Sequence, residues 1–240
     1  MRFFFLDEAL PAAGTAWRPP RALARHLGAL RLDVGETVLL LPPAGDGCEA
    51  TLEDDGRLRV GSARPRPDLP LADVVLATAW PKGPRADDLV VRATEAGVRA
   101  IVPLRCARSV GGRETFSAAR QERWKRLMRE TCQQCRNPRV PTLAVEPVPP
   151  EEALAAHASA RPVALLPGTW PLAMELELHP SPAWLLLVGP EGGFDDAEEA
   201  LFRERGVACA GLLPTILRIE AAGPAAVTLV QHHALARRGH

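Results

Sequence analysis

A glycine-rich stretch at residues 189–193, Gly-Pro-Glu-Gly-Gly, has the composition of a loop that holds a small molecule. Glycines let a main chain turn sharply and approach a ligand closely. The stretch follows an uncharged apolar run at 184–188, which is typical of a buried strand, and precedes Asp195-Asp196-Ala197-Glu198, which has the spacing of a helix capping box. Open α/β sheets bind ligands where such a strand ends, so the sequence predicts a ligand loop here. The alternative is a tight strand–helix turn that binds nothing.

The spacing of these glycines excludes two common kinds of ligand site. Neither the dinucleotide fingerprint G-x-G-x-x-G nor the P-loop G-x-x-x-x-G-K-[ST] occurs in the chain. The acids Asp195, Asp196 and Glu198 would also repel a phosphate placed at the start of the following helix. The predicted ligand is therefore neutral or cationic.

A second segment, Leu-Leu-Pro-Thr-Ile-Leu-Arg-Ile-Glu at 212–220, precedes a run of small and apolar residues. With Val-Gly-Pro-Glu-Gly-Gly at 188–193, it resembles the SPOUT class of RNA methyltransferases, specifically the bacterial family that methylates N3 of a uridine in small-subunit ribosomal RNA. The resemblance covers nearly the whole chain and includes Lys82-Gly83, residues 94–98 and 108–110, and Gln134-Cys135. It implies an N-terminal PUA-like β-barrel that binds RNA and a C-terminal knotted α/β domain that binds S-adenosylmethionine, a cationic sulfonium.

The same resemblance implies which residues form the site. Three loops would hold the cofactor mainly through backbone groups, and they comprise Leu165, Leu166, Pro167, Gly168, Gly189, Glu191, Gly192, Gly193, Leu212, Leu213, Ile216 and Leu217. Arg218 is the candidate for orienting the uracil or its phosphate, and Glu220 either fixes that arginine or acts as a base.

The resemblance also implies partners. Six arginines are the candidate RNA contacts: Arg2, Arg25, Arg31, Arg105, Arg108 and Arg113. For each of them the alternative is a solvated surface side chain that contacts no RNA. The substrate would be small-subunit ribosomal RNA or the 30S subunit, and related proteins lead us to expect a homodimer.

The chain departs from the family pattern at several positions. Leu213 replaces a glycine, Thr215 an arginine and Ala221 a threonine, while the usual Gly-Arg pair after Gln134 reads Arg136-Asn137. These changes leave open a methyltransferase with another uridine or RNA as its substrate. They also leave open a non-catalytic RNA-binding or ribosome-assembly protein on the same fold, and cofactor binding distinguishes the two.

Repeated prolines at 64–70 predict a linker between two domains, residues 1–68 and 69–240. The first domain is expected to be a small β-barrel, with strands at 3–6, 37–41, 47–52 and 58–60 and one helix at 21–30. In the second, strands at 71–78, 100–103, 162–166, 184–188 and 207–211 alternate with helices at 87–96, 117–134, 196–205 and 219–236. Such alternation predicts a mostly parallel sheet covered by helices on both faces. The trefoil knot is expected from the resemblance alone.

The 240 residues carry no net charge, but the charge is unevenly distributed. Residues 99–139 hold eleven basic and three acidic side chains, and residues 140–204 hold eleven acidic and two basic ones. One face is therefore expected to meet phosphates. Five cysteines without a second C-x-x-C pair predict neither a disulfide framework nor a metal site. With no signal peptide or membrane-spanning stretch evident, we expect a soluble cytoplasmic protein.

Overall fold

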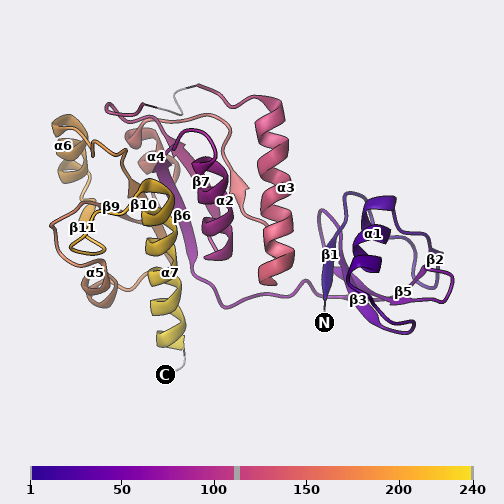
Figure 1. The fold of residues 1–240 in the computed structure, drawn as a ribbon. Coiled ribbons are helices and arrows are strands. Elements are labelled where there is room, and N and C mark those ends of the chain that lie inside the picture. The colour runs from indigo at the N-terminus through magenta and orange to yellow at the C-terminus, as the bar shows by residue number, and fades with distance from the viewer. Residues whose placement is uncertain (1, 111–113, 239–240) are drawn as a thin grey trace. The chain divides into compact units, whose positions relative to one another are not determined.

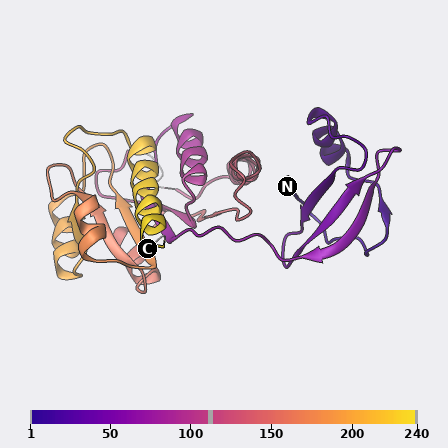
Figure 2. The same cartoon turned by 90° about the horizontal axis from the view of Figure 1, so that it is seen from below.

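The computed structural model describes residues 2–110 and 114–238, which divide into two compact units. The first unit is Met1–Leu69 with Gln133–Pro138, and the second is Pro70–Cys132 with Arg139–His240. Figures 1 and 2 show the elements of each unit from two directions. No helix of the described residues is both long enough and apolar enough to cross a membrane.

The first unit is built on one five-stranded sheet with the order β1-β3-β4-β5-β2. Strand β1 pairs parallel with β3, and the other neighbours are antiparallel. The sheet curls around a core that includes Phe4, Leu27, Leu40 and Leu58 (Figure 2). Its elements are β1 (Phe3–Phe5), β2 (Ala16–Trp17), α1 (Arg21–Ala29), β3 (Thr37–Leu41), β4 (Gly47–Leu52) and β5 (Leu58–Arg64). The two-residue strand β2 was not predicted, because so short a segment has no periodicity to read.

The second unit contains a six-stranded sheet with the order β11-β9-β10-β6-β7-β8. Every neighbouring pair in it is parallel, which confirms the sheet type predicted from the alternation. The strands are β6 (Asp73–Ala79), β7 (Ala100–Leu104), β8 (Thr142–Leu143), β9 (Arg161–Leu165), β10 (Ala183–Val188) and β11 (Ala208–Ala210). The chain after each of β6, β9, β10 and β11 therefore leaves the sheet at the same edge.

Side chains of the central strand β10 alternate between two separate cores. Trp184, Leu186 and Val188 belong to the core on one face, and Leu185 and Leu187 belong to the core on the other. Successive strand residues point to opposite faces, so a run that is apolar throughout requires cover on both sides.

Helices supply that cover on both faces of the sheet, as predicted (Figure 1). Side chains of α2 (Arg85–Glu95), α3 (Ala118–Cys135), α5 (Leu172–Leu178) and α7 (Ile219–Arg238) enter the first core. Side chains of α4 (Pro150–Ala156) and α6 (Asp196–Glu204) enter the second. The seven-residue helices α4 and α5 were not predicted, because two turns are too short for a clear helical period.

Helix α7 is anchored to the sheet at two points. The side chain of Gln231 hydrogen-bonds to both backbone groups of Ala72 and to the carbonyl of Gly97, at 2.8–3.0 Å. One turn after the helix begins, a Cβ on Gly223 would lie 2.8 Å from a methyl carbon of Leu76, so only glycine allows this close approach to β6. These anchors fix the start of α7 directly after the segment 212–218.

Candidate functional site

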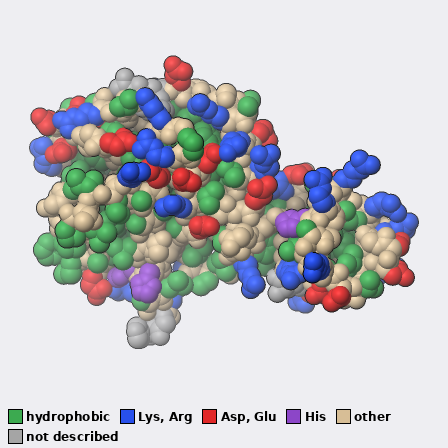
Figure 3. Space-filling model, in the orientation of Figure 1, with side chains coloured by type: hydrophobic (Ala, Val, Ile, Leu, Met, Phe, Trp, Pro, Cys, Tyr) green, Lys and Arg blue, Asp and Glu red, His purple; other side chains and the backbone are tan. Residues whose placement is uncertain are grey.

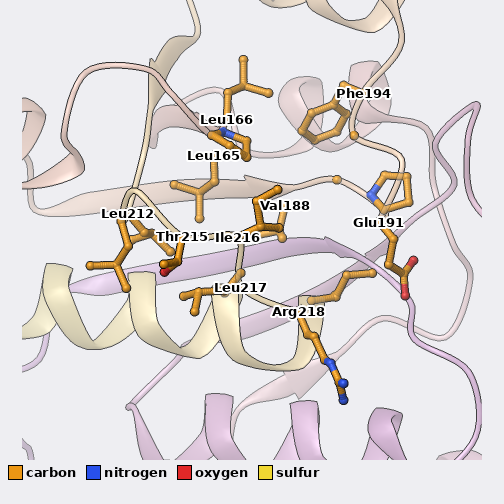
Figure 4. A pocket seen from close by; sticks show the side chains of 17 residues that line it. Leu165, Leu166, Val188, Glu191, Phe194, Leu212, Thr215, Ile216, Leu217 and Arg218 are labelled. Carbon is orange, nitrogen blue, oxygen red and sulfur yellow. The ribbon is translucent and has the colours of Figure 1, made fainter.

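Three loops meet at the carboxyl edge of the parallel sheet. They follow the adjacent strands β9, β10 and β11 and span residues 166–171, 189–195 and 211–218. Together they enclose a pocket of about 250 Å³, the three-loop pocket, which Figure 4 shows from close by. Its position is the one that the sequence predicts for a ligand loop at the end of a buried strand.

The lining of this pocket contains most of the residues predicted to bind a cofactor. Gly168 and Gly192 are the two that do not line it. Residues of the same loops, of the end of β10 and of the start of α7 complete the lining: Val188, Pro190, Phe194, Thr215, Arg218, Ile219 and Ala222. The glycine motif and its two flanking residues contain Val188, Pro190 and Phe194. These three residues could therefore have been predicted from the motif.

The glycine loop, residues 189–194, is held by hydrogen bonds from outside itself. Nη1 of Arg108 donates to the carbonyl oxygens of Gly192 and Phe194, each at 2.9 Å. The segment after β7 is thereby tied to the loop after β10. Arg108 was predicted as an RNA contact, and this bracing role could not be read from the sequence.

The start of α6 adds a second tie to the same loop. Asp195 and Glu198 form the predicted capping box, with each side chain accepting a bond from the other residue's backbone N–H. The second carboxylate oxygen of Glu198 accepts a bond from the N–H of Ala107 at 2.9 Å. Beside them, burial and then the negative charge of Glu198 raise the pKa of the Cys106 thiol to about 12, so this cysteine is an inert core residue.

Two glycines of the loop differ in what surrounds them. A Cβ on Gly189 would lie 3.2 Å from ring carbons of Phe194 and would crowd the pocket wall. A Cβ on Gly192 would meet Arg108 at 3.5 Å, an ordinary contact outside the pocket. Of these two glycines, Gly189 is therefore the one that lies in the pocket wall.

The third loop, residues 212–217, has little internal support. In the described part of the chain its backbone N–H and C=O groups make no hydrogen bonds with the protein. The side chains of Leu213 and Ile216 are 53% and 82% exposed. Its backbone groups are thus available to a ligand, as they would have to be if backbone contacts held the cofactor.

Arg218 and Glu220 have different surroundings. Arg218 lines the pocket, and its guanidinium points away from the apolar side chains of the opposite end (Figure 4). Glu220 does not line the pocket, and its buried Oε2 accepts no hydrogen bond from the described residues. The structure records no bond between the two side chains within residues 2–110 and 114–238.

The other described arginines predicted to contact RNA lie on the surface. Arg2, Arg25 and Arg31 are exposed in the first unit, and Arg2 donates to the carbonyl of Leu30 at 3.4 Å. Arg105 is exposed directly after β7, and Arg113 lies outside the described residues.

The described histidines, cysteines and acids form no cluster of three or more that could hold a metal ion. None of the five cysteines forms a disulfide.

Comparison with known proteins places this site in a family. A family model described as an RNA methyltransferase domain matches residues 67–231. This chain belongs to the RNA methyltransferase domain family. Ribosomal RNA small subunit methyltransferase E of Aquifex aeolicus is 31% identical over 168 residues, 68% of this chain and 70% of that protein. The Synechocystis protein of the same name is 31% identical over 221 residues, 86% of this chain and 68% of that protein.

A solved structure of a relative has a similar fold. The methyltransferase E of Neisseria gonorrhoeae, in a crystal structure bound to S-adenosyl methionine, matches with a TM-score of 0.78 at 26% identity. The match covers 97% of each chain. The resemblance seen in the sequence is thereby confirmed.

Two departures from the methyltransferase family pattern have a structural account. Leu213, in place of the usual glycine, has a negative φ, so a left-handed backbone is not required there. Arg136, in place of the other usual glycine, has a φ of 60° directly after α3 ends at Cys135. A left-handed residue at this position is a common helix terminator, and glycine adopts it at lower cost than arginine. The structure does not explain the change at Ala221.

Proposed function

We propose that this chain methylates N3 of a uridine in small-subunit ribosomal RNA, with S-adenosylmethionine as the methyl donor. One observation carries the proposal: three loops of the methyltransferase domain enclose a pocket in a chain that aligns over 97% of its length with an S-adenosyl methionine-bound relative. The relatives quoted above are named for action on the same ribosomal subunit.

The chemistry of the three-loop pocket fits this cofactor. Leu165, Val188 and Leu212 provide an apolar surface for an adenine ring, and the unpaired backbone groups of residues 212–217 provide hydrogen bonds for its edges. The lining has one carboxylate, Glu191, and one cation, Arg218, and it lacks a phosphate-binding loop, which suits a ligand without phosphates. When bound, S-adenosylmethionine supplies an electrophilic methyl group.

The chain's own contribution is to hold the uridine and to stabilise charge. N3 of uracil becomes a nucleophile when its proton leaves, so the site must favour the uracil anion. Arg218 at the end of the pocket is suited to that task, because a fixed cation stabilises charge that develops during the reaction. Positioning can supply up to roughly 7–11 kcal/mol of such a reaction's acceleration.

Glu220 has two possible roles in this proposal, orienting Arg218 or accepting the N3 proton. Its buried Oε2 makes no hydrogen bond in the described part of the chain and is free for either. Glu220→Gln separates the two roles, since the amide keeps an acceptor and loses the base. Loss of turnover at unchanged RNA affinity favours the base, and loss of RNA affinity favours the orienting role.

Isothermal titration with S-adenosylmethionine, with ATP and NAD as comparators, tests the cofactor assignment. We expect selective, saturable binding, followed by methyl transfer to small subunits that lack the modification. Folded protein that binds no cofactor, even with small subunits present, would contradict the proposal. It would favour the non-catalytic RNA-binding alternative, with Leu213 and Thr215 as the first residues to suspect.

Arg218→Ala tests the assignment of the active site. Methyl transfer should collapse while the affinity for S-adenosylmethionine changes little, because the guanidinium lies at the end of the pocket. Arg237→Ala, an exposed arginine in the last turn of α7, is the matched control. Full turnover in the Arg218 variant would remove this residue from the active site.

The proposal includes a homodimer, which the resemblance implies and one apolar surface supports. This surface consists of three exposed side chains at intervals of four residues. Met174 and Leu178 lie on α5, and Trp170 lies two residues before the helix begins. In Figure 3 hydrophobic side chains gather over this part of the molecule. Leu178→Arg should convert a dimer to a monomer in light scattering, whereas Val34→Arg, an equally exposed apolar position in the first unit, should not.

We further propose that residues 1–68 form a PUA-like barrel and residues 69–240 a SPOUT domain with a trefoil knot. The curled five-stranded sheet and the meeting of the three loops support these assignments. Arg2, Arg25 and Arg31 would then bind phosphates of the RNA, as would Arg105. The RNA partner is the small-subunit ribosomal RNA or the 30S subunit, in the cytoplasm.

A further inference from the structure

A second hollow lies next to the three-loop pocket. It has a volume of about 270 Å³ and forms where β6 ends and the chain turns into α2, with Lys82, Ser109 and Val110 in its lining. Pro190, Glu191 and Ile219 line this hollow and the three-loop pocket alike. The second hollow therefore adjoins the cofactor pocket at these three residues.

The second hollow continues into a wider one. The wider hollow has a volume of about 900 Å³, shares Trp80, Pro81, Lys82 and Val110 with the second, and extends to Arg120 on α3. Its floor includes Trp80, Phe116 and Trp124, whose ring centroids are about 5 Å apart. The three hollows thus lie in a row between the cofactor pocket and α3.

Two cations along this path have no partner. Within residues 2–110 and 114–238, the side chains of Lys82 and Arg120 make no hydrogen bond or ion pair, and both are exposed. Arg123 differs, because its Nε donates to Asp87 at 3.0 Å, and this bond lowers the pKa of that carboxyl. Lys82 and Arg120 are therefore free to bind an anion such as a phosphate.

One hydroxyl of the second hollow is able to donate to a ligand. Oγ of Ser109 accepts a bond from the N–H of Cys106 at 3.1 Å, and the residue is only 7% exposed. The Ser109 hydroxyl also lies beside the Cys106 thiol, and because sulfur is a weak acceptor, a carbonyl oxygen is able to replace it as the partner of this hydroxyl. Uracil presents carbonyl oxygens on both sides of N3, and either would accept a bond from this hydroxyl.

We propose that the second hollow is the seat of the target uridine. Ser109 donates to a uracil carbonyl oxygen, Lys82 binds a phosphate of the same strand, and the strand leaves through the wider hollow toward Arg120. The assignment rests on the proposed function, since a base to be methylated must leave its stack and lie beside the methyl donor. Pro190, Glu191 and Ile219 line both hollows, so a base in the second hollow lies beside the cofactor pocket.

The lysine content of the chain allows a direct test on the wild-type protein. Lys82 and Lys125 are its two lysines; Lys125 is exposed on α3 and paired with Glu122. An amine-reactive reagent should label both, and unmethylated small subunits with S-adenosylhomocysteine should protect Lys82 while Lys125 stays reactive. Equal labelling of Lys82 in the free protein and in a demonstrated complex would overturn the proposal.

Lys82→Ala provides the kinetic test. We expect KM for RNA to rise about tenfold, with little change in kcat, and the salt dependence of binding to lose a slope of about 0.7–0.9 for one phosphate contact. Lys82→Arg should retain the contact, Lys125→Ala is the matched control, and cofactor affinity without RNA should be unchanged in all three. Ser109→Ala should lower kcat/KM while RNA affinity changes little.

The outcomes separate this inference from the function on which it rests. Wild-type protein that binds no S-adenosylmethionine and methylates no RNA overturns both. Wild-type protein that methylates small subunits, together with a Lys82→Ala variant of unchanged KM and salt slope, overturns the uridine site alone.

Discussion

Two walls of the same pocket are built in opposite ways. The glycine loop at 189–194 is fastened by Arg108 and by the capping box at Asp195, and its Phe194 is buried. The third loop at 212–217 makes no backbone hydrogen bonds within the described chain and exposes its apolar side chains to solvent. Both line one pocket and follow strands of one parallel sheet.

The difference indicates which wall is formed before a ligand arrives. A loop whose geometry is already fixed loses little conformational freedom on binding, whereas an unsupported loop must be ordered by what it binds. We infer that the glycine loop sets the position of the ligand and that the third loop closes on it. The comparison can be tested one wall at a time.

The largest effect is expected from Gly189→Val. The new side chain would start 3.2 Å from the Phe194 ring at the pocket wall, so S-adenosylmethionine affinity should fall by more than about a hundredfold, which corresponds to ~2.7 kcal/mol. Isothermal titration measures the loss. Gly192→Ala is the control, because its Cβ would meet only Arg108 at an ordinary distance. Equal losses of affinity in the two variants would mean that cofactor binding does not depend on the absence of a side chain at Gly189 in particular.

Arg108→Ala should have the next largest effect. The glycine loop would lose the two hydrogen bonds that Arg108 donates to it, and cofactor affinity should fall about tenfold, or ~1.4 kcal/mol, even without RNA. Arg105→Ala, an exposed neighbour without such bonds, should leave cofactor affinity unchanged. If Arg108→Ala affects RNA binding alone, the loop does not depend on this brace.

Glu198→Ala should weaken the same wall through stability. Removing the carboxylate breaks the capping box and the bond to Ala107, at a cost of about 1–2 kcal/mol in the free energy of unfolding. Chemical denaturation followed by circular dichroism measures this change. Glu199→Ala is the control, because it removes a negative charge from the same helical turn and leaves the bonds of Glu198 in place. A comparable loss of stability in this variant would mean that the charge at the helix start, and not the bonds of Glu198, causes the effect.

The smallest effect is expected from Leu213→Gly in the third loop. Its side chain is half exposed and its φ is negative, so the variant should change the free energy of unfolding by less than about 0.5 kcal/mol. Thermal unfolding checks the stability, and titration checks the ligand. A marked drop in stability without ligand would show that the third loop is as firmly held as the glycine loop.

The glycine loop and the sheet edge were predictable from the sequence because their signals are local. The apolar run of β10, the glycines after it and the capping spacing of Asp195 and Glu198 each lie within a few residues. The parallel sheet followed from alternation along the chain.

Features that join distant segments were not predictable in this way. The bond from Arg108 to Gly192 spans 84 positions, and nothing near either residue indicates it. The same holds for Lys82, which was noted as part of the resemblance and not as a site residue. Its hollow exists only because β6 and β10 are neighbours in the sheet. Sequence also assigned Gly192 to the pocket, because it cannot tell which glycine of a cluster faces inward.

The anchor at Gln231 has a consequence for biosynthesis. This side chain bonds to residues 134 and 159 positions earlier, and α7 begins where the third loop ends. A nascent chain therefore cannot fix the start of α7, where the third loop ends, until residue 231 has been translated and has left the exit tunnel. The third loop gains a fixed end only after the sheet strands β6–β11 have already emerged.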